Sequence, residues 1–243
     1  MSYIRQDFID KINRLVRDKD SQLDDADAPD ALDSAVLMYS RYRPVLKMQA
    51  YTGDGTKIFP LPTGWVEDFS DENYRVEYPV DTTANQQQYL DRQMCEPYLT
   101  PTGKVLRFRA TVTTNFTPSA GEAFNVQFGI PHTLTDATND ISDAHFLPVC
   151  WLGASYLCTV LQQRYSEQSD QNGPGQLADF RDKAQKFQTL ATQYKKQFDS
   201  VIIPKAEDLR AAFRFAEFEG TPLHRERYPE FPETNEGYLY TDI

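Results

Sequence analysis

Residues 177–201, LADFRDKAQKFQTLATQYKKQFDSV, carry the clearest secondary-structure signal in the chain. Apolar side chains recur at alternating intervals of three and four residues, which places them on one stripe of an α-helix. These positions are Leu177, Phe180, Ala184, Phe187, Ala191, Tyr194, Phe198 and Val201. The opposite face carries Arg181, Asp182, Lys186, Gln188, Gln193 and Lys196. The pattern predicts an amphipathic helix with one face on a core and the other in solvent.

The preceding stretch, residues 146–165, predicts a second helix that is apolar nearly all round. Its periodic positions are Phe146, Val149, Cys150, Gly153, Leu157, Val160, Leu161 and Tyr165. Such a helix must be covered on more than one side. Asn172-Gly173-Pro174-Gly175 breaks the pattern between the two helices. Because the link is short, we expect an antiparallel helix hairpin over residues 140–203, with Leu157 and Phe187 buried at its interface.

Two further helices are predicted at the N-terminus, within residues 1–50. Residues 3–18 place Ile4, Phe8, Ile12 and Leu15 on one face. Pro29 suits the first turn of the next helix, and Pro44 is expected to kink or end it. That helix carries Leu32, Ala35, Val36, Tyr39, Tyr42 and Leu46.

An acidic stretch, residues 20–30, lies between these helices and has two interpretations. A calcium loop is one, but the stretch lacks the glycine and the twelfth-position glutamate of an EF-hand. The other is a solvated linker whose carboxylates favour the start of a helix. We therefore expect a linker.

Residues 51–135 are predicted to form a small inserted antiparallel β-unit. Alternating apolar residues recur at 76–80, 106–112 and 124–130, with a turn at Thr117–Glu122 between the last two runs. Residues 104–130 therefore predict a long hairpin with one solvated face, and residues 81–93 an exposed loop. The predicted fold class is α+β, mainly helical: a helix bundle with this insert and an extended C-terminal tail.

The tail, residues 204–243, combines prolines with many aromatic residues, whereas disordered tails usually lack aromatics. Leu209, Ala212, Phe213 and Ala216 allow a short helix within it. We expect the tail to be mobile in the free subunit and to order on a partner, because aromatic anchors dominate interface energetics. The candidate partner-binding residues are Phe213, Phe215, Phe218, Arg225, Arg227, Tyr228, Phe231, Tyr238 and Tyr240.

Composition and charge disfavour several kinds of partner and location for this protein. The formal net charge of −11 disfavours nucleic acid as a direct ligand and anionic membrane surfaces as a partner. No uninterrupted apolar run approaches the roughly 18 residues that span a bilayer, and residues 1–8 have no signal-peptide core. The odd cysteine count favours reduced thiols in a protein made in the cytoplasm.

The sequence offers little chemistry. It contains no phosphate loop, no nucleophile elbow and no His-Glu-x-x-His motif. Cys150 and Cys158 lie about two helical turns apart, and we interpret them as small core residues rather than metal ligands. A nucleophilic pair of Cys150 with His145 is disfavoured, because residues five apart share no helix face. We therefore predict no catalytic, cofactor-binding or metal-binding residues, and a protein that is not an enzyme.

The order of these elements resembles the head-to-tail adaptor (connector) proteins of tailed bacteriophages. The residues that carry the resemblance are LDSAVLMYSRY at 32–42, GDG at 53–55, FPLPTGW at 59–65, LGASYLC at 152–158 and FRDKAQKF at 180–187. The resemblance implies a twelve-copy ring in the virion neck, below the portal protein, that extends the DNA channel and holds a tail or neck protein beneath. DNA would pass through without specific binding. It also implies docking on the portal through residues 204–243.

Two other classes remain as alternatives. One is another phage tail-completion or baseplate component, for which a three-fold or six-fold assembly is expected. The other is a small soluble enzyme with an unrecognised site in the β-unit, for which a monomer with hydrolase activity is expected. The native mass of the protein distinguishes the three.

Overall fold

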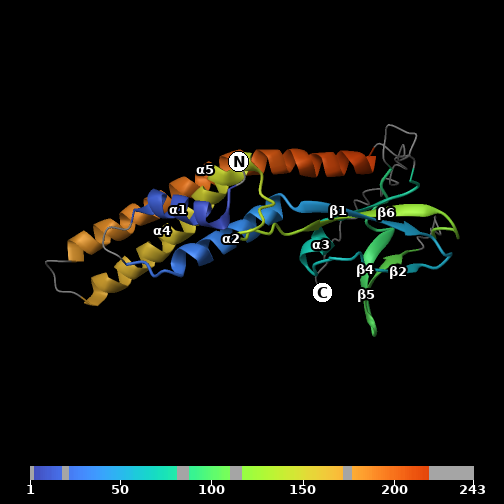
Figure 1. Ribbon diagram of the computed structural model, residues 1–243, viewed down its shortest axis with the longest axis horizontal. Helices are drawn as coiled ribbons and strands as arrows, with labels where there is room; N and C mark the ends of the chain where they lie inside the picture. The colour runs from blue at the N-terminus through green and yellow to red at the C-terminus, as the bar shows by residue number, and fades with distance from the viewer. Residues whose placement is uncertain (1–2, 18–21, 81–87, 110–116, 172–176, 219–243) are drawn as a thin grey trace, which may run out of the picture.

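The computed structural model describes residues 3–17, 22–80, 88–109, 117–171 and 177–218, with the side chains at 169–171, 177–179 and 204–218 left out of the description. The molecule is elongated, with a helical bundle at one end and a β-unit at the other (Figure 1). The fold is mixed α and β with two small antiparallel sheets, which confirms the predicted class at that level.

The bundle consists of α1 (Arg5–Val16), α2 (Asp27–Tyr42), α4 (Phe146–Gln171) and α5 (Leu177–Phe218), and the short helix Asp143–His145 leads into α4. Helix α4 packs against α1, α2 and α5. This confirms the prediction that its apolar circumference is covered on more than one side. Gly153 leaves room for the side chain of Ile12 on α1, because a Cβ at position 153 would lie 2.5 Å from Ile12 Cδ1.

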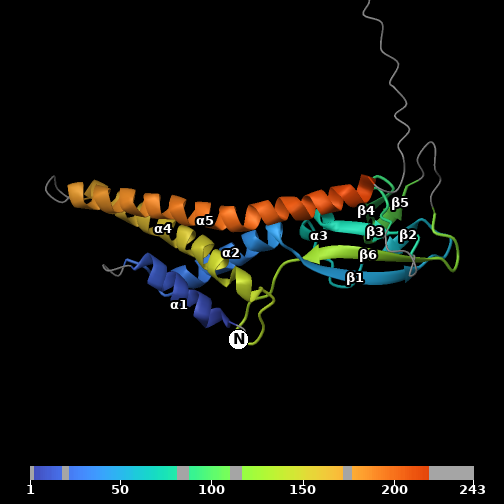
Figure 2. The same ribbon diagram turned by 90° about the horizontal axis from the view of Figure 1, so that it is seen from above.

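Helices α4 and α5 run antiparallel along most of the bundle (Figure 2). The Ser155 hydroxyl donates a hydrogen bond of 2.9 Å to the carbonyl oxygen of Ala191. Further along α4, Tyr165 stacks on Phe180 and Phe187, which precede Ala191 on α5. Leu157 is buried as predicted, but Phe187 is only half-buried, because its ring covers Tyr165 at the bundle surface.

The β-unit contains two three-stranded sheets that face each other. One has the order β1 (Val45–Thr52), β6 (Ala123–Ile130), β3 (Tyr74–Glu77), and the other β2 (Ile58–Pro60), β5 (Gly103–Phe108), β4 (Cys95–Thr100). The four-residue helix α3 (Phe69–Glu72) precedes β3. The apolar core between the sheets is Phe59, Tyr74, Val76, Cys95, Leu106, Phe108, Phe124, Val126 and Phe128.

The predicted hairpin over residues 104–130 is wrong. Strand β5 pairs with β2 and β4, whereas β6 pairs with β1 and β3. The tight Pro101–Thr102 turn joins β5 to β4 instead. The two predicted strands meet face to face across the core, where the rings of Phe108 and Phe124 lie 5.2 Å apart. Alternation correctly identified the buried faces but does not specify the hydrogen-bonding partner.

The predicted boundary between helices and β-unit, at residue 50, is also wrong. Helix α2 ends at Tyr42, and β1 begins at Val45. Leu46, expected on the helix face, is an exposed residue of β1. Pro44 explains the change, since proline disfavours helical conformation at the residue before it and lacks the amide donor that a helix needs.

The expected extended tail from residue 204 is contradicted over its first part. Helix α5 continues through Pro204 to Phe218, a length of 42 residues or about 63 Å. Its end lies alongside the β-unit (Figure 2). Pro204 removes one intrahelical hydrogen bond, and the residues that follow it include the strong helix formers Lys205, Ala206, Arg210, Ala211 and Ala212.

Among the residues that the structure describes, the helical segment Asp143–Gln168 is long and apolar enough to cross a membrane by length and composition. This window therefore contradicts the expectation that no apolar run is long enough to span a bilayer. However, 61% of the window is buried inside the protein, as expected for the central helix of a bundle.

Candidate interaction surfaces and the clamps that position them

The residues predicted to bind a partner lie at the end of α5 and beyond it. Phe213, Phe215 and Phe218 belong to the last turns of α5 in the backbone, and their side chains lie outside the description. The other predicted anchors lie outside the described residues: Arg225, Arg227, Tyr228, Phe231, Tyr238 and Tyr240. The structure therefore gives no positions for these side chains relative to one another.

The outer face of α5 is a polar, cationic surface. Arg181, Lys186, Lys195 and Lys196 are all exposed there, against one exposed carboxylate, Asp182. Between them lies a shallow hollow lined by Gln188, Thr189, Thr192, Gln193, Lys196, Gln197 and Ser200. We call residues 181–200 on this side the α5 face. Its positive charge contrasts with the net charge of −11 for the whole chain.

A group of carboxylates lies around Arg5 on another part of the bundle. The Arg5 guanidinium donates a hydrogen bond to Asp33, and Asp30 and Asp136 also lie within electrostatic range. The Asp33 hydrogen bond and these negative charges raise the pKa of Arg5, although partial burial opposes them. One cation is thus surrounded by three carboxylates from α2 and the loop before α4. We call these residues the Arg5 side. Helices α1 and α5 lie on opposite sides of α4 (Figure 2).

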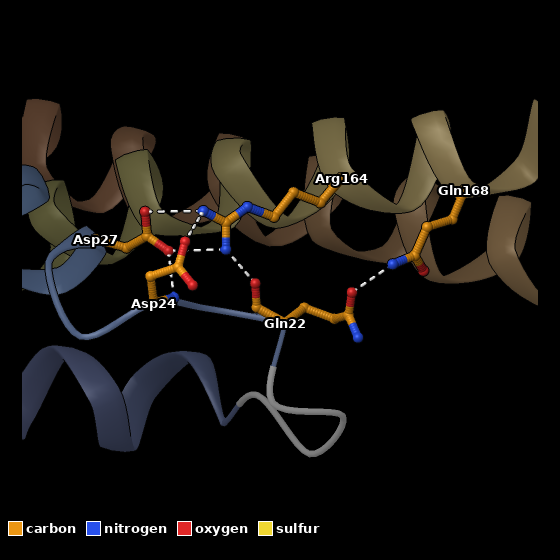
Figure 3. A network of polar contacts seen from close by, with 5 residues as sticks. All are labelled: Gln22, Asp24, Asp27, Arg164 and Gln168. Carbon is orange, nitrogen blue, oxygen red and sulfur yellow. Dashed lines mark hydrogen bonds and ion pairs between the residues drawn. The ribbon is translucent and has the colours of Figure 1, made fainter.

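The acidic linker before α2 is held by a clamp on α4 (Figure 3). One guanidinium nitrogen of Arg164 lies 2.9 Å from Asp27, and the other lies 3.0 Å from Asp24. Arg164 also donates to the backbone carbonyl of Gln22, whose side chain accepts a hydrogen bond from Gln168. Asp24 and Asp27 therefore neutralise a cation, and their described partners are not those of a calcium loop.

A second clamp joins the two crossings between bundle and β-unit. His132 Nε2 lies 2.7 Å from the carbonyl oxygen of Arg43, so the ring nitrogen donates. The backbone N–H of His132 donates to Ser40 Oγ at 2.9 Å. Arg43 also faces His145 Nε2 at 3.3 Å, and Tyr39 Oη lies 2.7 Å from His145 Nδ1.

The proton positions of the second clamp follow from its geometry. A guanidinium only donates, so His145 Nε2 accepts from Arg43 and Nδ1 carries the proton toward Tyr39. The clamp ties the residues before β1 to those after β6. It therefore restrains the orientation of the β-unit on the bundle.

The fold gives the candidate reactive residues, Cys150 and His145, different neighbours. His145 serves the second clamp, whereas Cys150 faces the backbone of Phe8 with Sγ 4.0 Å from its carbonyl oxygen. Burial raises the pKa of Cys95, Cys150 and Cys158 to about 12 each. Within the described part of the chain, no group of three or more His, Cys, Asp or Glu residues is arranged to hold a metal ion.

Both clamps were missed by the sequence analysis. Arg164 is the first charged residue of α4, at the end of its apolar stretch, and that charge was a signal that a carboxylate partner was needed. His132 and Arg43 gave no comparable signal, because they are 89 residues apart and meet only through the fold.

No protein-family model matches the chain, and no curated protein matches it in sequence.

Proposed function

We propose that the protein is a structural, non-enzymatic component of the virion neck of a tailed bacteriophage. In this proposal it is a head-to-tail adaptor that forms a ring, of twelve copies, below the portal protein. The ring extends the DNA channel and joins the tail or neck protein beneath it. The segment from residue 204 docks on the portal.

The observation that carries the proposal is the opposite charge of two separate groups of residues on one elongated subunit. The α5 face presents Arg181, Lys186, Lys195 and Lys196, whereas the Arg5 side gathers carboxylates. In a cyclic assembly one surface of each copy contacts a different surface of the next. Opposite charges on the two groups favour that head-to-tail contact and oppose like-to-like contact of either group.

The shape of the subunit is consistent with this role. The helical bundle and the β-unit lie at opposite ends, and α5 extends past the bundle (Figures 1 and 2). A ring of such subunits has separate levels, so the bundle can supply the ring contacts while another part of the chain meets a neighbouring protein. The second clamp restrains the β-unit on the bundle.

The native mass of the full-length protein tests the ring. A species near twelve times 27.9 kDa is expected for the assembled protein released from portal-bearing heads, measured by native mass spectrometry and light scattering. A three-fold or six-fold particle would instead indicate a different tail component. A protein that stays monomeric and hydrolyses substrates would contradict the proposal.

Charge reversal tests the contact itself. Lys195→Glu with Lys196→Glu is expected to prevent ring formation, and Asp30→Lys with Asp33→Lys to do the same. Mixing the two variants should restore association. The negative α5 face of the first variant can then contact the positive Arg5 side of the second, and the unchanged surfaces complement each other as in the parent. Lys57→Glu, an exposed charge change in the β-unit, is the matched control and should leave the ring intact. Equal loss in the control, or no loss in either variant, would place the contact elsewhere.

A further inference from the structure

Strand β1 leaves one edge of its sheet open. All eight of its residues pair with β6, from Val45 with Ile130 to Thr52 with Ala123, without a bulge. The N–H of Gly129 bonds to the carbonyl oxygen of Asn73, on the far side of β6 from β1. Leu46, which pairs with Gly129, therefore directs its own N–H and carbonyl away from β6.

In an antiparallel ladder the backbone groups of successive residues point alternately toward and away from the partner strand. Every second residue of β1 therefore directs its N–H and carbonyl outward, as Leu46 does. Leu46, Met48, Ala50 and Thr52 direct four N–H groups and four carbonyls outward. No described backbone group pairs with them. Their side chains are exposed as well, 43% for Leu46 and 51% for Met48. A long strand edge with apolar side chains is a template for another strand.

The other described strand edges are shorter or already occupied. Beside β3, Val76 and Tyr78 bond to the backbone at Leu90 and Gln88. On β4, Pro97 has no N–H to offer, and the carbonyl of Cys95 accepts from Tyr74. Strand β2 has only three residues. Among the strands that the structure describes, β1 alone combines length with a free edge.

We propose that two copies of this chain pair antiparallel along β1, about a two-fold axis at Gln49. In this register Leu46 lies opposite Thr52 of the second copy, and Met48 opposite its Ala50. All four outward N–H groups and all four outward carbonyls of each copy then find partners. The contact is isologous, so each copy contributes the same surface.

The side chains support self-pairing in this register. The charged residue of the strand, Lys47, lies opposite Tyr51 of the second copy, so no like charges meet and a cation–π contact is available. Gln49 lies opposite Gln49 of the second copy. Its Oε1 already accepts from the N–H of Thr63 in the same copy, so the side chain offers its amide N–H groups to the second copy. The β1 contact uses none of the residues of the α5 face or the Arg5 side. It therefore goes beyond the proposed ring. Because an isologous contact does not close a head-to-tail ring, the pairing belongs to free copies before they join the ring, and it is tested independently of the ring.

A cross-linking experiment tests both the pairing and its register. Gln49→Cys in the full chain is expected to give a disulfide-linked dimer on mild oxidation, since directly opposite residues have Cβ atoms about 5 Å apart. Lys47→Cys is the matched control, on the same face of the same strand. Its equivalents are separated by about 13 Å in this register and should not cross-link. Equal cross-linking of both variants, or of neither, would overturn the proposed pairing.

A backbone variant and amide exchange complete the test. Met48→Pro removes an outward donor without touching the β6 ladder and should give a folded monomer at concentrations where the parent is a dimer. Met48→Thr keeps the N–H and should still pair. In the parent, the amides of Leu46, Met48, Ala50 and Thr52 should exchange at least tenfold more slowly in the dimer than at high dilution. Fast exchange at every concentration, or a dimer that persists in Met48→Pro, would overturn the inference.

Discussion

The ring of Phe187 on α5 lies parallel to the ring of Tyr165 on α4, with centroids 5.6 Å apart and an interplanar angle of 3°. Tyr165 is buried beneath it, whereas Phe187 is partly in solvent. The stack marks the outer end of the contact between the two long helices. Nearer the middle of α4 the contact becomes fully buried, at Leu157 and Leu161.

Leu157→Ala is expected to destabilise the subunit by about 2–5 kcal/mol, because the side chain is fully buried and its removal leaves a cavity. Urea unfolding of the isolated subunit measures this loss. Gln163→Ala, an exposed position on the same helix, should change stability by less than about 0.5 kcal/mol. Similar values for the two variants would contradict the packing of α4.

Arg164→Ala should cost about 1–3 kcal/mol, since it takes the guanidinium from the partly buried Asp27, which keeps the N–H of Asp24, and from the carbonyl of Gln22. Arg164→Lys should recover only part of this, because an ammonium cannot reproduce the fork that reaches Asp24 and Asp27 together. Lys186→Ala, an exposed cation on α5, is the control. Urea midpoints compare the three variants, and an unchanged Arg164→Ala midpoint would mean that the clamp contributes nothing.

The three thiols are expected to resist alkylation in the folded protein. With the pKa of each raised to about 12 by burial, only about one in ten thousand is ionised at pH 8. Iodoacetamide should label none at that pH and all three in urea, as read by mass spectrometry. The ordinary thiol pKa is 9.0, so the unfolded chain loses these protons first, and stability should fall as the pH rises from 9 towards 12. Rapid labelling of the folded protein would contradict this burial.

Burial lowers the pKa of His132 below its ordinary value of 6.5, although the carbonyls of Arg43 and Asp140 oppose the shift. The unfolded chain therefore binds this proton more readily, and the associated stability is lost as the pH falls below 6.5. The free energy of unfolding between pH 7.5 and 5 should decrease less in His132→Gln than in the parent protein. His224→Gln, which also removes one histidine, is the control. If the free energy of unfolding depends on pH in the same way in His132→Gln and in the parent, His132 is not the group responsible.

Truncation tests the predicted docking segment. A chain that ends at Phe218 retains the whole of α5 and should keep the helical circular dichroism of the parent. Under the proposed function it should lose attachment to portal-bearing heads, because the aromatic residues from Tyr228 to Tyr240 are gone. A chain that ends at Ile203 also lacks residues 204–218 of α5. The difference in attachment between the two truncations measures what these last helical turns contribute. Unchanged attachment of both truncations would locate the docking surface elsewhere.

The sequence alone determined the helices and which of their faces are buried. The three-and-four spacing of α5 and the continuous apolar surface of α4 are local properties, set by 3.6 residues per turn. The alternation that buries Leu106, Phe108, Phe124 and Val126 is local in the same way. Each of these patterns is complete within one element, so no knowledge of its neighbours was needed.

Only the tertiary structure decided which elements meet. Strands β5 and β6 have the same pattern whether they pair in one sheet or face each other across a core, because burial of one face is equal in both arrangements. Arg164 with Asp27, and His132 with Arg43, are joined by contacts between residues far apart in the chain. The end of α5 was likewise not set by Pro204, since the helix continues through it to Phe218. Pairing, clamps and helix length thus depend on sums of many contacts, which periodicity does not encode.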